Sequence, residues 1–163
     1  IILMNKFFLK LFPAAGLIEK GDWYGNDTVW RGTLDLNKIL FYADKCGDLQ
    51  NRRMRRYFSI IDGIVGGEGE GPLAPVPKHC GVLIGGANPL FVDIVATRLM
   101  DFDYRKIPLL RNAFKITKSP LAVDKVQDIV VRSNINEYER LLKKDKGYCK
   151  FKPPKGWKSH IEL

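Results

Sequence analysis

Residues 56–100, RYFSIIDGIVGGEGEGPLAPVPKHCGVLIGGANPLFVDIVATRLM, contain most of the information on the fold. Residues 57–61 are aromatic and β-branched, which is typical of a half-buried strand, and the strand is predicted over 57–65. A glycine-rich acidic loop (66–72) and a second strand at 81–86 follow. Asn88 is placed to cap a helix over 89–100, with Pro89 at its first position. Two predicted strands followed by a helix indicate an α/β fold.

Four carboxylates of this stretch are candidates for chemistry: Asp62, Glu68, Glu70 and Asp93. A carboxylate at the end of a buried strand, such as Asp62, is costly unless it is paired. The glycines around Glu68 let the backbone approach a ligand. A glycine turn that leads into a helix N-terminus forms an anion site where its N–H groups are unpaired. These features favour a divalent cation, Mg²⁺ or Mn²⁺, that bridges the carboxylates to an anionic ligand.

We therefore expect a site beside the turn at 85–88. The residues expected to be catalytic and to ligate the metal are Asp62, Glu68 and Asp93. The residues expected to bind the ligand are Gly67, Gly69, Glu70, Gly85 and Asn88. The structural alternative is that Asp62 and Asp93 cap neighbouring turns while the glycines form a tight loop.

Several segments resemble a known family. They are IDGIVGGEGEGPL (61–73), GVLIGGANPLFVDIVATRLMDFD (81–103), KIPLL (106–110) and GLIEKGDWYGNDTVWRGTLDLNKIL (16–40). Together they are similar to the family called domain of unknown function 362. The resemblance implies an α/β domain that is sometimes found with ferredoxin-type iron–sulfur modules, and it supplies no reaction. It also implies that this chain is the C-terminal part of a longer family member, whose further strands precede the segment at 23–26.

The rest of the chain completes the predicted architecture. Residues 1–163 are expected to form a single α/β domain with a mixed sheet flanked by helices. Further helices are predicted at 27–43, 108–114 and 136–144, and a buried strand at 128–132. The apolar segment at 1–12 is interpreted first as a buried segment left by truncation. The alternatives are an interfacial helix and the remnant of a longer chain. If strands are missing, the uncovered apolar surface should promote self-association.

The composition and charge of the chain favour an ordinary globular protein. Apolar residues make up 45% and charged residues 28% of the chain, as in ordinary globular proteins, and no apolar run is long enough for a membrane span. The net charge of +9 arises entirely in residues 105–163, which contain 15 Lys and Arg against 6 Asp and Glu. No nucleic-acid motif accompanies this charge, so nucleic acid is not an expected partner and a solvated basic surface is favoured.

The three cysteines, Cys46, Cys80 and Cys149, show no Cys-x-x-Cys spacing. This argues against a zinc ribbon, a self-contained iron–sulfur cluster and a disulfide scaffold, and a reducing cytoplasm fits best. A nucleophile pair of Cys80 and His79 is disfavoured, because adjacent strand residues point to opposite faces.

Two classes of function stay open. The first is a metal-assisted or carboxylate-based enzyme that acts on a small anionic ligand. The second is a binding or redox-partner module without catalysis, which would dock an iron–sulfur protein through its basic C-terminal third. Divalent-metal binding that depends on Glu68 and Asp93 would favour the first class. Salt-sensitive association with an acidic partner would favour the second.

Overall fold

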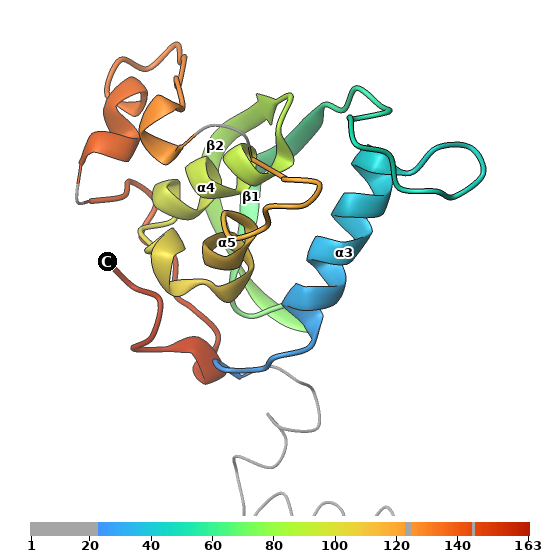
Figure 1. Ribbon diagram of the computed structural model, residues 1–163. Coiled ribbons are helices and arrows are strands. Elements are labelled where there is room, and N and C mark those ends of the chain that lie inside the picture. The colour runs from blue at the N-terminus through green and yellow to red at the C-terminus, as the bar shows by residue number, and fades with distance from the viewer. Residues whose placement is uncertain (1–22, 123–124, 145) are drawn as a thin grey trace, which may run out of the picture.

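The computed structural model describes residues 23–122, 125–144 and 146–163 and has a mixed α/β fold (Figure 1). Its regular elements are α3 (Val29–Tyr42), β1 (Ser59–Glu70), β2 (Ala74–Gly86), α4 (Pro89–Leu99) and α5 (Pro108–Ala113). The 3₁₀ turns are η1 (Tyr104–Lys106), η2 (Val126–Asp128), η3 (Tyr138–Lys143) and η4 (Lys155–Trp157). The predicted helices at 27–43, 89–100 and 108–114 are thus confirmed. No helix of the described part is long and apolar enough to cross a membrane. The expectation for residues 1–12 lies outside the described residues.

β1 and β2 form a long antiparallel hairpin. Their register runs from Ser59 opposite Gly86 to Glu70 opposite Ala74. The prediction of a loop over 66–72 was therefore wrong for most of its length, since residues 66–70 belong to β1. A glycine still supplies one N–H and one C=O to a ladder, so a well-placed partner strand outweighs its low strand propensity.

The expected mixed sheet is not formed by the described residues. Their sheet has two strands. The predicted strand at 128–132 is absent, because Asp128 ends η2 and residues 129–132 do not join the sheet. The predicted helix at 136–144 is also wrong, because the chain forms the short 3₁₀ turn η3 there. Only Leu141 of that turn is buried, and a short helix with so little tertiary packing is marginal in water.

A register shift changes which side chains of β1 face inward. In the first half of β1, Ile61 and Gly63 are partly covered, while Ile60 and Asp62 are exposed. The register then shifts between Gly63 and Val65. Beyond this bulge the even-numbered residues face inward, and Glu68 is buried at 7% exposure. Two residues of equal parity on either side of the bulge therefore lie on opposite faces of the hairpin.

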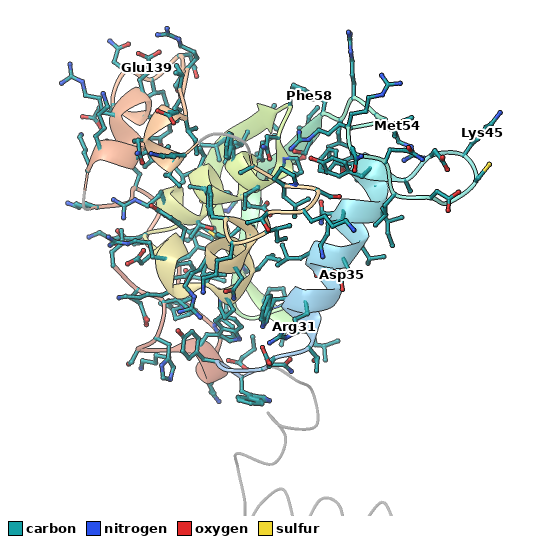
Figure 2. All side chains as sticks on the ribbon, viewed as in Figure 1. Arg31, Asp35, Lys45, Met54, Phe58 and Glu139 are labelled. Carbon is teal, nitrogen blue, oxygen red and sulfur yellow. The ribbon has the colours of Figure 1, made fainter. Side chains whose placement is uncertain are left out.

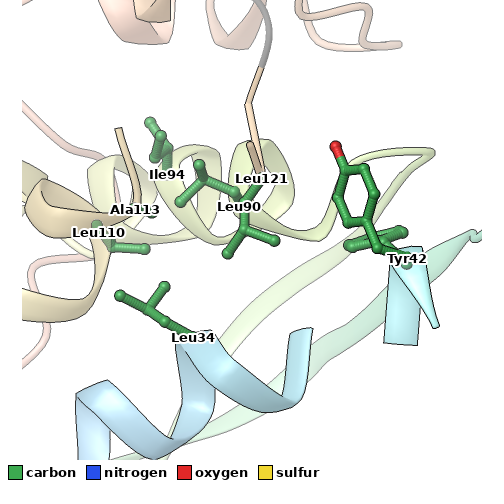
Figure 3. Packing of buried hydrophobic residues seen from close by; sticks show 8 residues of the cluster. Leu34, Tyr42, Leu90, Ile94, Leu110, Ala113 and Leu121 are labelled. Atoms are coloured by element: carbon green, nitrogen blue, oxygen red, sulfur yellow. The ribbon is translucent and has the colours of Figure 1, made fainter. Parts of the chain in front are cut away.

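Helix α4 packs on the inner face of the hairpin and joins it to the core (Figure 1). Asn88 caps this helix by accepting the N–H of Leu90 at 3.0 Å. The core brings together side chains from α3, α4, α5 and the segment after α5 (Figure 3). Its buried members are Leu34, Phe41, Tyr42, Leu90, Ile94, Leu110, Ala113 and Leu121.

The outer face of the hairpin carries exposed apolar side chains. Ile60, Ile64 and Leu83 are 68%, 53% and 67% exposed. Phe58, just before β1, adds to this surface with 64% exposure and is labelled in Figure 2. These four residues are called the outer apolar face below. Contiguous exposed apolar side chains of this kind favour association.

Residues 147–152, which we call the strap, run between the end of α4 and the hairpin. The N–H groups of Tyr148 and Cys149 donate to the carbonyl of Leu99 at 3.1 and 2.9 Å. On the other side, the N–H of Gly69 donates to the carbonyl of Lys152 at 2.9 Å. The strap therefore connects the end of α4 to the end of β1, near the turn of the hairpin.

Candidate functional site

Glu68 is the most buried of the predicted site carboxylates, and it binds the strap. Its Oε2 accepts the N–H of Lys152 at 3.0 Å. The ammonium groups of Lys78 and Lys152 lie 3.5 and 3.7 Å from its carboxylate oxygens. The Lys152 N–H and these cations lower the pKa of Glu68 against the opposing effect of desolvation. Glu68 is therefore ionised, and its carboxylate already has a hydrogen-bond donor and two cations of this chain as partners.

Asp62 lies on the outer face and away from Glu68. Its Oδ1 accepts the N–H of Ile64 at 3.1 Å, and its side chain is exposed. Six residues of strand separate the two carboxylates along β1, which corresponds to about 20 Å. The bulge after Gly63 also places them on opposite faces. The expectation that Asp62 and Glu68 converge was wrong for both reasons.

Asp93 lies on the side of α4 that faces α3. It borders a small cavity of about 40 Å³ that is also lined by Asn37 and Phe41. Asp93 is exposed to solvent on one side. The protein around its carboxyl group still removes enough water to raise the pKa of Asp93. Asn88, the last residue of the turn at 85–88, lines the same cavity, whereas the hairpin carboxylates Asp62 and Glu68 do not.

The expected metal centre does not fit this arrangement. Among the described residues, no group of three or more His, Cys, Asp or Glu side chains is placed to hold a metal ion. Glu68 already pairs with Lys78 and Lys152, and Asp62 and Asp93 lie in separate places. The described residues therefore do not bring together a ligand set for Mg²⁺ or Mn²⁺.

The expected anion site at the start of α4 is also changed by the structure. The N–H of Leu90 donates to the Asn88 side chain, and those of Phe91 and Val92 donate to the Asn88 carbonyl. Asn88 Nδ2 in turn donates to the carbonyl of Leu121 at 3.1 Å. The first-turn N–H groups are thus satisfied within the chain, so this helix end is a cap rather than an anion cradle.

The other predicted ligand-binding residues of β1 have structural contacts. Glu70 Oε1 accepts the N–H of Lys155 at 2.7 Å. Gly69 has a φ of 78° and donates to the strap, a conformation that favours glycine. At Gly67 a Cβ would lie 2.8 Å from the Cβ of Pro75, so a larger residue would clash with the opposite strand. These glycines are explained by the hairpin and the strap.

A large pocket of about 700 Å³ opens beside β2 and includes Gly85 and Asn88. Helix α4 forms one wall through Phe91, Val95 and Leu99. The segment 128–135, which starts at the end of η2, forms a further wall together with side chains of η3. This is within the size range of small-molecule sites, which is about 300–1,000 Å³.

Two charged residues of the segment 128–135 line this pocket, and both are exposed to solvent. The charged lining residues are Asp128 and Arg132. Asp128 Oδ2 accepts the N–H of Lys125 at 3.1 Å, which partly occupies that carboxylate. No hydrogen bond or ion pair of Arg132 is found within the described part of the chain. Sequence reasoning missed the role of Arg132 and of the segment 128–135 in the pocket, because it predicted residues 128–132 as a buried strand.

Comparison with known proteins places this architecture in a family. The family model for the domain of unknown function (DUF362) matches residues 16–98. The chain belongs to the DUF362 family. Neither a search of curated proteins nor a search of solved structures gives a significant match.

The DUF362 match covers only part of the pocket. It includes α3, the hairpin and α4 up to Arg98. The wall at 128–135 and the strap lie beyond the matched residues. The family pattern therefore contributes β2 and α4 to the pocket, whereas its charged side is formed by the C-terminal part of this chain.

Proposed function

We propose that this DUF362 protein binds a small organic anion in the pocket between β2, α4 and residues 128–135. The observation that carries the proposal is the pocket itself, about 700 Å³ in volume, at the end of β2. Its walls are mostly apolar, and a few polar groups lie on one side, a combination that is common in small-molecule sites.

The sign of the proposed ligand charge follows from Arg132. A guanidinium presents several N–H donors in a plane and pairs in a bidentate manner with a carboxylate or a phosphate. The other charged lining residue, Asp128, already accepts a backbone N–H. An acid with an apolar body would satisfy Arg132 and bury its remaining atoms against Phe91 and Val95.

Binding is supported better than catalysis by the predicted carboxylates. Asp62, Glu68 and Asp93 are not among the residues that line this pocket. Catalytic roles for these three residues remain part of the enzyme hypothesis. That hypothesis requires a reaction centre that the pocket does not supply.

The proposal is tested by a thermal-shift screen of the protein against aliphatic and aromatic carboxylates and phosphate esters, followed by titration calorimetry of the hits. Arg132→Gln should weaken binding of a hit at least about tenfold, the usual scale for losing a charged hydrogen bond. Val95→Trp should block binding by filling the pocket. Arg111→Gln removes an equivalent charge from α5, outside the pocket lining, and is the matched control. Hits that bind Arg132→Gln and Val95→Trp as tightly as the parent protein would refute the proposal.

A second candidate function is docking to an acidic iron–sulfur protein. The observation that favours it is the charge of residues 105–163, with 15 Lys and Arg against 6 Asp and Glu. Lys115, Lys118 and Lys158 are examples of side chains exposed on this part of the chain. Such association with a small acidic ferredoxin should weaken steeply as salt rises and should be unaffected by Val95→Trp.

We also propose that residues 1–163 form a single domain, with helices packed around the hairpin, and that the protein works in the reducing cytoplasm. The shared core of α3, α4 and α5 supports the first statement. Three free cysteines without a Cys-x-x-Cys motif support the second. Limited proteolysis that releases stable fragments would contradict the single domain.

A further inference from the structure

Two cysteines that are distant in the sequence meet between the hairpin and the strap. Cys80 lies on β2 and Cys149 on the strap, and both are partly buried. Their thiol groups lie close enough to interact, and this interaction is one cause of the raised pKa of the Cys149 thiol. The side chain of Tyr138 lies near both sulfur atoms, and its ring packs against Tyr148 with centroids 4.8 Å apart.

Independent contacts hold the two backbone segments in place. Lys78, two residues before Cys80, donates from Nζ to the carbonyl of Lys150 at 3.3 Å. The N–H of Cys149 donates to Leu99 at 2.9 Å, as described above. A Cβ at Gly66 would lie 2.8 Å from the ring of Phe151, so the strap packs closely on β1 as well. The two thiols thus face each other from segments that are fixed on both sides.

We propose that Cys80 and Cys149 are a dithiol–disulfide site that covalently locks the strap onto the hairpin when the protein is oxidised. The two side chains already interact, and the contacts of Lys78 with Lys150 and of Gly66 with Phe151 hold the hairpin and the strap together beside them, so a bond between the sulfur atoms would join segments that are already adjacent. In a reducing compartment such a bond is transient and responds to oxidants.

The roles of the two thiols differ. Burial and the neighbouring Cys80 raise the pKa of the Cys149 thiol to about 12, so Cys149 is protonated and a poor nucleophile at neutral pH. The first attack is therefore assigned to Cys80, and Cys149 is the resolving thiol. The oxidant we name is a small-molecule disulfide, RSSR. Cys80 attacks one sulfur of RSSR and releases RS⁻, which takes up the proton that Cys80 lost.

The second half of the exchange closes the site. Cys149 loses its proton and attacks the Cys80 sulfur of the mixed disulfide, which releases the second RS⁻ to accept that proton. In total, two protein thiols are oxidised to one disulfide, and one RSSR is reduced to two RSH. Gly81 and Tyr138, which neighbour these sulfur atoms, also line the large pocket, so oxidation acts at one end of it.

The test uses the full chain and oxidised glutathione. Cys46 is the internal control, because it is exposed on the loop between α3 and β1, next to Lys45 at the loop tip (Figure 2). After oxidation and denaturation, alkylation should label one cysteine instead of three, and peptide mass spectrometry should find Cys80 joined to Cys149. The conservative variants Cys80→Ser and Cys149→Ser should each abolish the cross-link, whereas Cys46→Ser should retain it.

The decisive measurement uses the oxidised parent protein, so it does not depend on whether a variant folds. Oxidation that leaves Cys80 and Cys149 alkylatable would refute it. Separate glutathione adducts on the two residues, or cross-links only between chains, would also refute it. The binding test of the pocket is independent of this outcome, because it uses the reduced protein.

Discussion

Replacing Glu68 by Gln tests the strap contact, because it removes a charge from a buried position while keeping the size of the side chain. Glu68 is 7% exposed and accepts the N–H of Lys152 at 3.0 Å. A hydrogen bond to a charged group contributes about 1.5–3 kcal/mol, whereas a neutral one contributes about 0.5–1.5 kcal/mol. The amide oxygen of Gln retains the acceptor, so the substitution loses about 1–1.5 kcal/mol from this bond.

The two lysines add less to this loss. The Lys78 side chain is 30% exposed, and its pair with Glu68 at 3.5 Å contributes up to about 0.5 kcal/mol. The Lys152 side chain is 82% exposed, so solvent screens that pair almost completely. Because part of the Glu68 carboxylate still meets solvent near these lysines, we expect Glu68→Gln to cost about 1–2 kcal/mol of unfolding free energy at pH 7.

The assay is urea unfolding followed by the fluorescence of tryptophan, including Trp157 in η4 just after the strap. The matched control is Asp62→Asn, the same chemical change on the exposed face of the same strand, with an expected effect within about 0.5 kcal/mol. Equal unfolding free energies for Glu68→Gln and Asp62→Asn at pH 7 would refute the reasoning.

The pH dependence follows from the lowered pKa of Glu68. A carboxyl group with a lower pKa in the folded state contributes stability that is complete above the unfolded-state pKa, about 4.5. This contribution is lost as pH falls through the lower, folded-state pKa. The stability difference between the parent protein and Glu68→Gln should therefore be constant from pH 7 to about 5.5 and disappear in stronger acid.

Three further predictions concern other parts of the fold. Asn88→Ala removes the α4 cap and the bond to Leu121, and chemical denaturation should show a loss of about 1–2 kcal/mol. Asp93 has a raised pKa, so its ionised form opposes folding; Asp93→Asn should melt slightly above the parent protein at pH 7, and the gain should vanish below about pH 3.8. The double variant Ile60→Lys/Leu83→Lys should reduce self-association through the outer apolar face in light scattering, and a parent protein that stays monomeric at high concentration would contradict this prediction.

Local sequence patterns determined the elements that depend on neighbours along the chain. The apolar periodicity of α3 and the Asn88–Pro89 start of α4 follow from helix geometry and capping within a few residues, and both helices are present. The β-branched run at the start of β1 likewise identifies a strand. The motifs around the hairpin and α4 also identified the family, since its model matches residues 16–98.

The arrangement of side chains was decided by tertiary structure. The two-residue period of a strand places Asp62 and Glu68 on one face, but a single shift in register between Gly63 and Val65 reverses this, and no residue pattern marked it. Residues 128–132 have strand composition, yet a strand forms only where a ladder partner is available, and the described residues provide none there.

The partners of the buried groups were decided by tertiary structure as well. Glu68 binds the N–H of Lys152, 84 residues later in the chain, and Cys80 meets Cys149 on the same strap. Such contacts depend on how the C-terminal segment crosses the hairpin, which local propensities do not encode. The sequence alone therefore determined the identity of the main elements and of the family. The tertiary structure decided which carboxylates are free, where the pocket lies and which thiols meet, because burial and pairing arise only when distant segments pack together.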